Sequence, residues 1–489
     1  MVTARRALSA HASGSRKLAL TKPEQPPSTA AIASSSIPAA RPVSRSHLAF
    51  PKPGPVAKLV QHRSVTSLGK TQGRLVIIGS GWAGYKLLRN IDTRNYEVVC
   101  VSPRNYFLFT PLLASSAVGT LEHRAIIEPV RQFNKPLQFH QASCDSIDFD
   151  KKVIHCTSRL EDNNKNFTLA YDKLIIAPGA HSNTFGIEGV QENAVFLKDI
   201  ADARRIRSRV IECFEHAMQP GTTEEEQLAL LHFQVVGGGP TGVEFSAELF
   251  DFVTEDLRKL YPSLMPKVQI TLYDVAPRIL GAFDASLSSE ATKRFMRRGI
   301  KVRTGTRVAK VEPGTIVLAS GERVPFGLLV WATGITQTPL VRSLADRLMA
   351  ETKGLGRIVT DDNLRALKPD GTPLPDVFAL GDCAMIKGSD LPATAQVANQ
   401  KAVYLAKQLN KPEAPMQPFA YKHLGSMAYI GGWRAVADIS KEFKPSGWGA
   451  WVFWRSAYLT MSVSWRNKAL IPMFWFLAWA FGRDVSRFR

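Results

Sequence analysis

Two glycine-rich turns, each set between a strand-like and a helix-like segment, constrain the fold of this chain more than any other feature. The first, Gly79-Ser80-Gly81-Trp82-Ala83-Gly84, follows the largely β-branched residues 74–78 and precedes residues 85–91, which are compatible with a helix. The second, Gly237-Gly238-Gly239-Pro240-Thr241-Gly242, lies between residues 233–236 and 243–250. In such a unit the first glycine permits the tight turn, the second lets a pyrophosphate approach the backbone, and the third lets the helix pack on the strand. We therefore predict two dinucleotide sites, at Gly79, Gly81 and Gly84 and at Gly237, Gly239 and Gly242.

Each turn has a later companion, an apolar strand that ends in a glycine. Residues 174–177 lead to Gly179, and residues 329–332 lead to Gly334. The number of residues between the two turns nearly equals the number between these two later glycines. Two unrelated turns would not be expected to share this spacing. We therefore predict an internal repeat of two doubly wound α/β domains, with Gly179 and Gly334 among the cofactor-binding residues. The alternative is a pair of Rossmann-like folds of which one is empty.

The residue that ends the second strand of each repeat indicates which nucleotide binds. Asp274 follows the predicted strand 268–273, and a carboxylate there favours the ribose hydroxyls of NADH over the phosphate of NADPH. Its distance from Gly237 exceeds the usual ~20 residues, which requires a long helix across residues 240–260. The nearby Arg278 leaves the choice between NADH and NADPH open at this point. In the first repeat Ser102 follows residues 97–101, and a hydroxyl binds a ribose more weakly than a carboxylate does.

A third element, Val377-Phe378-Ala379-Leu380-Gly381-Asp382, is a predicted strand that ends in Gly-Asp. In flavoproteins with two dinucleotide domains, the carboxylate of such a pair binds the ribityl chain of FAD. Gly381 and Asp382 are thus candidate FAD-binding residues, and the first domain is predicted to be interrupted by the second and completed here. An ordinary turn at the end of a strand is the alternative.

The net charge of +20 comes in large part from the N-terminus, since residues 1–70 hold eleven basic residues and one acid. This segment is rich in Ser, Ala, Pro and Arg and lacks an apolar run, which is typical of a mitochondrial transit peptide; a disordered basic tail is the alternative. The remainder is mildly charged, so nucleic acid is not an expected partner. The five cysteines form no close pair, and neither a disulfide framework nor a metal site is predicted.

The C-terminus is unusually rich in tryptophan, with six of the nine tryptophans between residues 448 and 481. Such density suits a bilayer interface, whereas the longest apolar stretch, residues 469–481, is shorter than the ~20 residues of a spanning helix. We predict an amphipathic helical region that lies on the lipid surface. Its basic residues, Arg455, Arg466, Lys468, Arg483, Arg487 and Arg489, would meet anionic headgroups. A homodimer interface or a buried core helix is the alternative, and both roles can coexist.

From Arg74 to Arg489 the chain resembles the type II, or alternative, NADH:quinone oxidoreductases of mitochondria. Three stretches carry the resemblance: residues 102–113 (SPRNYFLFTPLL), residues 391–400 (LPATAQVANQ), and residues 454–458 together with 481–484. Similar enzymes with the Ser-Pro-Arg sequence use FAD, which implies that Ser102 and Arg104 belong to the flavin site. The resemblance also implies that Thr110 and Pro111 lie near the isoalloxazine ring and that Gln396 and Gln400 lie where the quinone meets the flavin. Spaced at i and i+4, these glutamines would share one helix face.

The resulting expectation is an enzyme that passes electrons from NADH through FAD to membrane ubiquinone in the respiratory chain, without pumping protons. Glu244, just beyond the second glycine turn, is the candidate for positioning the nicotinamide, and Glu248 is expected to be structural. We divide the chain into residues 1–70 (transit peptide), 72–200 and 351–425 (FAD domain), 201–350 (NADH domain) and 426–489 (C-terminal region for membrane association or dimerisation).

The absence of a predicted membrane-spanning segment before Arg74 and of an acidic calcium-binding loop favours the matrix face of the mitochondrial inner membrane.

Two alternative functions share the double-domain architecture. A disulfide or sulfide:quinone oxidoreductase would need a reactive cysteine pair, and the spacing of Cys144 and Cys156 fits neither common motif. An NADH-sensing protein resembling apoptosis-inducing factor is disfavoured by the mild charge of the mature chain and by its aromatic C-terminus.

Overall fold

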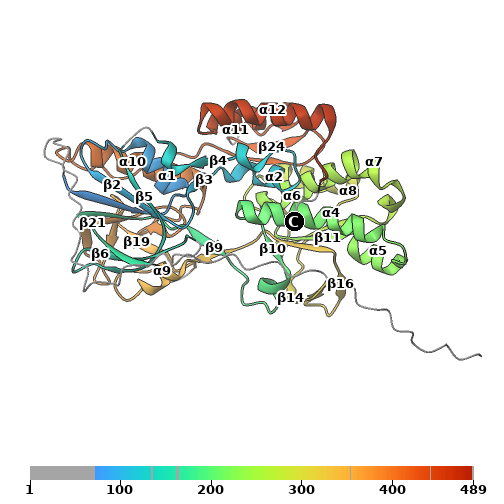
Figure 1. Ribbon diagram of the computed structural model, residues 1–489, viewed down its shortest axis with the longest axis horizontal. Helices are drawn as coiled ribbons and strands as arrows, with labels where there is room; N and C mark the ends of the chain where they lie inside the picture. The colour runs from blue at the N-terminus through green and yellow to red at the C-terminus, as the bar shows by residue number, and fades with distance from the viewer. Residues whose placement is uncertain (1–71, 134–135, 161–164, 353, 441, 487–489) are drawn as a thin grey trace, which may run out of the picture. The chain divides into compact units, whose positions relative to one another are not determined.

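A computed structural model describes residues 72–133, 136–160, 165–352, 354–440 and 442–486. The predicted transit peptide, residues 1–70, lies outside these residues. The described chain forms two larger sheets whose central strands are parallel, together with helices, several small sheets, and a C-terminal segment that ends in two helices (Figure 1).

The first sheet has ten strands and is built from two separate stretches of the chain. Its central strand β1 (Arg74–Ile78) pairs in parallel with β8 (Lys173–Ile176) on one side and with β2 (Glu97–Ser102) on the other. β21 (Pro373–Ala379) follows the second sheet in the sequence and pairs with β8, with Val377 opposite Leu174. The predicted interruption of the first domain is therefore confirmed. The strand order is β22 (Ala384–Ile386), β19 (Ile358–Thr360), β20 (Arg365–Leu367), β21 (Pro373–Ala379), β8 (Lys173–Ile176), β1 (Arg74–Ile78), β2 (Glu97–Ser102), β5 (Gln138–Asp148), β6 (Val153–Ser158) and β7 (Asn166–Ala170).

The second sheet has five strands and repeats the centre of the first. Its order is β10 (Val195–Phe196), β17 (Leu328–Trp331), β11 (His232–Val236), β12 (Gln269–Tyr273) and β13 (Lys301–Arg303). The order β17-β11-β12 matches β8-β1-β2, and all these pairings are parallel. Nearly every residue of β1, β8, β11 and β17 is buried, as expected of parallel strands covered on both faces. The internal repeat is therefore confirmed.

The chain passes between the two sheets through β9 (Ala180–Ser182) and β18 (Ile335–Gln337), which pair antiparallel. These strands follow directly on Gly179 and Gly334, the matched glycines of the repeat. Three further small sheets contain β3 (Tyr106–Leu108) with β4 (Ile127–Pro129), β14 (Val308–Glu312) with β15 (Thr315–Leu318) and β16 (Arg323–Pro325), and β23 (Ser426–Tyr429) with β24 (Ala435–Asp438) and β25 (Ser446–Gly447).

The helices that follow the glycine turns begin inside those turns. α1 (Trp82–Asn90) starts three residues before the sequence-based estimate and packs on α10 (Ala395–Asn410). The expected long helix over 240–260 is α6 (Pro240–Phe252), a π-helical turn (Val253–Leu257) and α7 (Arg258–Leu260). The other helices are α2 (Leu113–Ala117), α3 (Val190–Asn193), α4 (Ile200–Ala217), α5 (Glu224–Leu230), α8 (Ala285–Arg298) and α9 (Pro339–Ser343).

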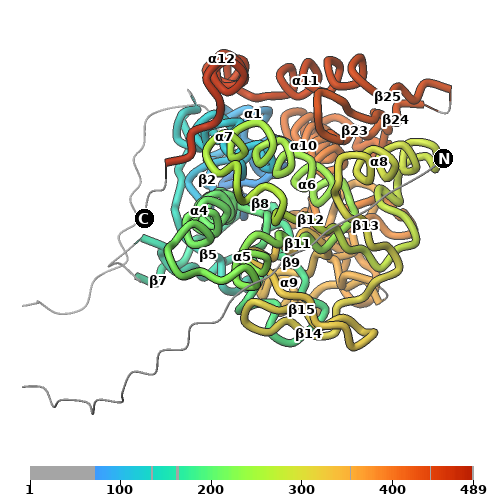
Figure 2. The backbone as a smooth tube through the Cα atoms, turned by 90° about the vertical axis from the view of Figure 1, so that its right-hand side faces the viewer, coloured from blue at the N-terminus to red at the C-terminus, as the bar shows by residue number. Residues whose placement is uncertain are grey.

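The C-terminal helices α11 (Trp448–Met461) and α12 (Trp465–Phe481) lie side by side at the top of Figures 1 and 2. Trp451, Trp454 and Trp475 face inward and are buried. The outward faces are apolar as well, where a surface helix normally carries polar residues; Trp465 is 86% exposed and Phe481 is 81% exposed. Among the described residues, no helix is long and apolar enough to cross a membrane.

Arg483 does not have the role predicted for it. Instead of facing outward, its side chain is 8% exposed and forms ion pairs with Glu255 (2.9 Å) and Asp256 (2.6 Å) at the end of α6. The prediction was wrong because the chain turns back on α6 after α12, so that Arg483 neutralises acids that would otherwise be buried alone. Arg487 and Arg489, predicted to act with it, lie outside the described residues.

Candidate functional site

The two glycine turns have the same geometry. Gly79 and Gly237 have φ angles of +102° and +120°, which favour glycine. A Cβ atom on Gly84 would lie 1.9 Å from the carbonyl oxygen of Gly79, and one on Gly242 would lie 1.9 Å from that of Gly237. The third glycine of each turn thus allows the helix to contact the turn directly, as the sequence predicted. The second glycines, Gly81 and Gly239, have open space where a side chain would be.

A cavity of about 810 Å³ opens beside the first turn. Nine of the predicted site residues line it, from both parts of the first domain and from α6: Gly79, Gly81, Ser102, Arg104, Thr110, Gly179, Glu244, Gly381 and Asp382. Thr241 and Glu244, in the first turns of α6, bring the helix of the second glycine turn to the wall of this cavity. The predicted residues that do not line it are Gly84, Pro111, Gly237, Gly239, Gly242, Asp274, Gly334, Gln396 and Gln400.

Polar contacts hold the loop that follows β2 at the rim of the cavity. The hydroxyl oxygens of Ser102 and Ser80 lie 2.9 Å apart. Arg104 forms an ion pair with Asp199 (2.9 Å), which also accepts a hydrogen bond from the hydroxyl of Tyr106 (2.8 Å). Asp199 is the N-cap of α4, so this one carboxylate links the predicted flavin site to the helix that leads into the second domain.

Two oppositely charged residues, Lys198 and Asp382, line the cavity. Burial raises the pKa of Asp382 above its ordinary value and lowers the pKa of Lys198, while the charge of each partially offsets the shift of the other. Lys198 also lines the cavity and was missed in the sequence. It lies in the short segment between β10 and α4, where no spacing or motif marks it. The cavity wall thus carries a cation close enough to the predicted ribityl-binding carboxylate to lower its pKa.

Asp274 lies at the end of β12, as predicted, and its carboxylate is bound to backbone. It accepts hydrogen bonds from the backbone N–H groups of Gly238 and Ala276. The carboxylate therefore lies against the second glycine turn, at the carboxyl end of the strands, where a doubly wound sheet binds its nucleotide.

Glu244 connects the second glycine turn to the C-terminal segment. Its Oε1 atom accepts hydrogen bonds from the backbone N–H of Tyr429 and the indole N–H of Trp454, both at 3.1 Å. No described residue donates to Oε2, and the side chain lines the cavity. Burial raises the pKa of Glu244 to about 8, against the opposing effect of its two donors. The carboxyl group therefore carries a proton at neutral pH and presents Oε2 to the cavity.

Gln396 and Gln400 bind one segment of the chain, residues 422–425. Gln396 donates to the carbonyl of Gly425 (3.3 Å) and accepts from the N–H of Leu424 (3.1 Å). Gln400 donates to the carbonyl of Lys422 (2.7 Å) and accepts from its N–H (3.0 Å). The two amides thus lie on the same face of α10, as their spacing indicated, and fix the segment that leads into the C-terminal region.

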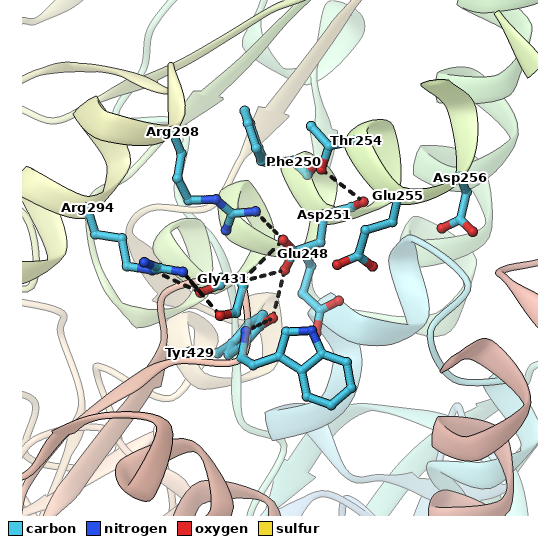
Figure 3. A network of polar contacts seen from close by, with 12 residues as sticks. Glu248, Phe250, Asp251, Thr254, Glu255, Asp256, Arg294, Arg298, Tyr429 and Gly431 are labelled. Carbon is cyan, nitrogen blue, oxygen red and sulfur yellow. Dashed lines mark hydrogen bonds and ion pairs between the residues drawn. The ribbon is translucent and has the colours of Figure 1, made fainter. Parts of the chain in front are cut away.

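A buried network holds the loop after β23 against α6 and α8. Figure 3 shows the Asp251 carboxylate between Arg298 and Tyr429; it pairs with the Arg298 guanidinium and accepts from the Tyr429 hydroxyl (2.7 Å). Arg294 donates to the carbonyl of Gly431 (2.8 Å). Since Tyr429 also donates its N–H to Glu244, the network fixes the position of the donor that holds the cavity-facing carboxyl.

The structure brings together two cysteines that the sequence left apart. Cys144 on β5 and Cys156 on β6 are directly opposite in the antiparallel register, and Cys144 lines the cavity. A hydrogen bond with Cys156, and then burial, raise the pKa of the Cys144 thiol above its ordinary range. Burial raises the pKa of Cys383 to about 12.

Known proteins resemble this chain along almost all of its described length. The pyridine nucleotide-disulphide oxidoreductase family matches residues 73–402, and the NDH2 C-terminal domain matches residues 423–484. A probable NADH dehydrogenase of Dictyostelium discoideum is 44% identical over 85% of this chain and 91% of its own length. The internal alternative NAD(P)H-ubiquinone oxidoreductase A1 of Solanum tuberosum, a mitochondrial protein, is 43% identical over 85% of this chain and 88% of its own.

Solved structures agree with these relatives. NDH2 from Plasmodium falciparum in complex with NADH is similar with a TM-score of 0.80 and 28% identity, over 84% of this chain and 99% of that one. The sulfide:quinone oxidoreductase of Aquifex aeolicus, at 19% identity and a TM-score of 0.61, shares the fold alone. With both segments matched and relatives above 40% identity along its length, this chain belongs to the type II NADH dehydrogenase (NDH2) family of pyridine nucleotide-disulphide oxidoreductases.

Proposed function

We propose that this protein oxidises NADH and reduces ubiquinone by way of a bound FAD. The observation that carries the proposal is the shared wall of the large cavity, which the first glycine turn and the helix of the second turn both line. Two dinucleotides bound at these turns would meet at that wall. The names of the relatives, alternative NAD(P)H-ubiquinone oxidoreductases, support both the donor and the acceptor.

The residues that line the cavity fit FAD. Gly81 leaves open space at the N-terminus of α1, where backbone N–H groups and the helix dipole favour a pyrophosphate. Ser102 and Arg104 would hold the adenosine end, Asp382 the ribityl chain, and Thr110 with Pro111 the ring. Thr110 is fixed by the indole N–H of Trp82, which donates to its hydroxyl oxygen at 3.0 Å. When bound, FAD supplies acceptance of a hydride and delivery of two electrons to a quinone.

Asp274 would select NADH at the second turn by accepting from its ribose hydroxyls and repelling the 2′-phosphate of NADPH. Asp274→Asn is expected to raise the ratio of kcat/KM for NADPH over NADH by about 10- to 100-fold, since one like-charge contact costs about 1–3 kcal/mol. Steady-state kinetics with both nucleotides would test this. An unchanged ratio would mean that another group recognises the ribose. Asp284→Asn serves as the charge-matched control, because it removes a carboxylate at the start of α8.

Glu244 would hold the nicotinamide with a hydrogen bond from its protonated Oε2. Gln396 and Gln400 would place the quinone beside α10, whose residues Ala395 and Ala398 line the same cavity. Because the two amides already bind residues 422–425, they would act by holding that segment at the quinone entrance.

The protein would work in mitochondria, at the inner membrane. Its exposed aromatic residues on α11 and α12 support attachment of residues 426–489 to the lipid surface, and the same face could join two copies. The matrix side is supported by the relatives, since internal enzymes are 42–43% identical and external ones 36–38%. The division at residues 200, 350 and 425 remains our proposed set of domain limits.

A stopped-flow experiment would test the function. We expect the purified protein to be yellow, NADH to bleach the flavin within milliseconds to seconds, and ubiquinone to restore the oxidised spectrum at a rate that supports turnover. A colourless protein would overturn the proposal. A flavin that NADH reduces but ubiquinone does not reoxidise would favour an NADH sensor.

A further inference from the structure

A second cavity, of about 310 Å³, lies between α11, α12 and the end of α6. We call it the C-terminal cavity. It shares no lining residue with the large cavity. Its walls are aromatic and charged, and they include five tryptophans: Trp433, Trp451, Trp454, Trp475 and Trp479.

Arg455 lies in this cavity with its hydrogen-bond donors unused. Its guanidinium carbon is 4.3 Å from the ring centre of Trp451 and 4.3 Å from that of Trp475, so an indole contacts it on two sides. No described residue forms an ion pair with Arg455, and its buried Nε atom has no hydrogen-bond partner. Stacking occupies the faces of a guanidinium and leaves the N–H groups at its edge, which match the oxygens of a phosphate or carboxylate.

Three acids and three cations line the cavity, and most of them are already paired. Arg483 pairs with Glu255 and Asp256 and lies 4.0 Å from Glu248, which also accepts from the hydroxyls of Ser115 (2.6 Å) and Thr120 (2.9 Å). Arg455 and Lys259 form no ion pair with any described residue, although the charge of Glu248 acts on Arg455. These two cations are therefore the groups whose N–H donors can contact an anionic ligand.

The surroundings of the cavity indicate which kind of ligand bears the anionic group. Trp479 and Phe481 line the cavity and are also largely exposed, at the outer end of α12. Exposed apolar side chains continue from them along both helices. An inorganic anion would make no use of this surface, whereas the acyl chains of a lipid would cover it.

We propose that the C-terminal cavity binds the phosphodiester group of a membrane phospholipid between Arg455 and Lys259, with the acyl chains against α12. This inference rests on the proposed attachment to the lipid surface. It adds a specific headgroup site to a general apolar contact, and it fixes how the C-terminal helices are oriented toward the bilayer.

The test uses the full chain, purified in detergent and titrated with dihexanoyl-phosphatidylglycerol under native mass spectrometry. We expect one lipid per chain, and Arg455→Gln is expected to weaken binding by about 10- to 100-fold through loss of charge-assisted hydrogen bonds. Arg347→Gln is the matched control. Arg347 lies outside the C-terminal region and lines neither cavity, it pairs with Asp150 (2.6 Å), and its loss is expected to leave lipid binding unchanged.

Several outcomes would overturn the proposal. Equal loss in Arg455→Gln and Arg347→Gln would indicate general attraction to charge, and binding of inorganic phosphate as tight as that of the lipid would indicate a free-anion site. If Arg455→Gln does not fold, Lys259→Gln replaces it and is expected to weaken lipid binding by a few fold. Unchanged lipid binding in Lys259→Gln would overturn the proposal. Flotation with phosphatidylglycerol vesicles separates the two hypotheses: a chain that floats but holds no bound lipid refutes this site alone, while a chain that does not float refutes membrane attachment.

Discussion

Gly84→Ala is expected to give a colourless protein whose free energy of unfolding is lower by about 3 kcal/mol or more. The added Cβ would lie 1.9 Å from the carbonyl oxygen of Gly79 and 2.9 Å from its carbonyl carbon. Backbone atoms cannot rotate away as a side chain can, so α1 must move off β1. That movement would deform the turn expected to hold the pyrophosphate. Flavin absorbance and urea unfolding of the purified variant would measure the two effects.

Gly81→Ala is the matched control for this variant. Gly81 is three residues earlier in the same turn, its backbone has φ −75° and ψ −164°, and no atom lies within 4 Å of where its Cβ would be. We expect normal stability of the flavin-free protein and flavin binding weaker by about 10- to 100-fold, because the methyl group would occupy the approach of the pyrophosphate. If Gly84→Ala kept its flavin, or if both variants unfolded equally, the assigned roles of the two glycines would be wrong.

The sequence predicted those parts of the fold that depend on neighbouring residues. Each glycine turn, its strand and its helix form one contiguous unit, and the unit occurs twice, so the repeat and the interrupted first domain were both predictable. The turn Gly381-Asp382, just after the end of β21 at Ala379, could be placed for the same reason. The start of α1 at Trp82 was missed because Gly84, a poor helix former, is itself part of the first helical turn.

Contacts between distant segments could not be predicted. The partners of Glu244 are 185 and 210 positions away in the sequence. Nothing in the residues around Glu244 indicates that these distant segments contact it. The pairing of Cys144 with Cys156 depends on the register of β5 and β6, and a bulge between Cys144 and Ser146 sets that register. Arg483 looked like a membrane-facing cation because its acidic partners lie on another element. Sequence spacing therefore identified nine of the residues that line the cavity, but not the contacts that hold them.

The second large effect is expected at Glu244, where Gln should stabilise the protein at alkaline pH. The pKa of this carboxyl rises from an ordinary 4.5 to about 8 on folding. The unfolded chain releases this proton above pH 4.5 and the folded chain retains it, so stability falls by about 1.4 kcal/mol per pH unit until the pH exceeds 8. Glu244→Gln removes this dependence. The variant should match the wild type near pH 4.5 and exceed it by about 5 kcal/mol at pH 9, as measured by urea unfolding at both pH values.

The same variant separates two roles for Glu244. Glutamine still accepts from Trp454 and Tyr429 and still offers an N–H to the cavity, so a hydrogen-bonding role predicts kcat/KM for NADH within about tenfold of the wild type. It also predicts that the wild type loses activity as the pH rises through 8 and that Glu244→Gln does not, because ionisation removes the donor only from the acid. A loss of 100-fold or more with full flavin content would instead assign proton transfer to Glu244. In either case a buried acid that costs stability at neutral pH is retained where it faces the ligand, which is the pattern expected of a functional group and not of a structural one.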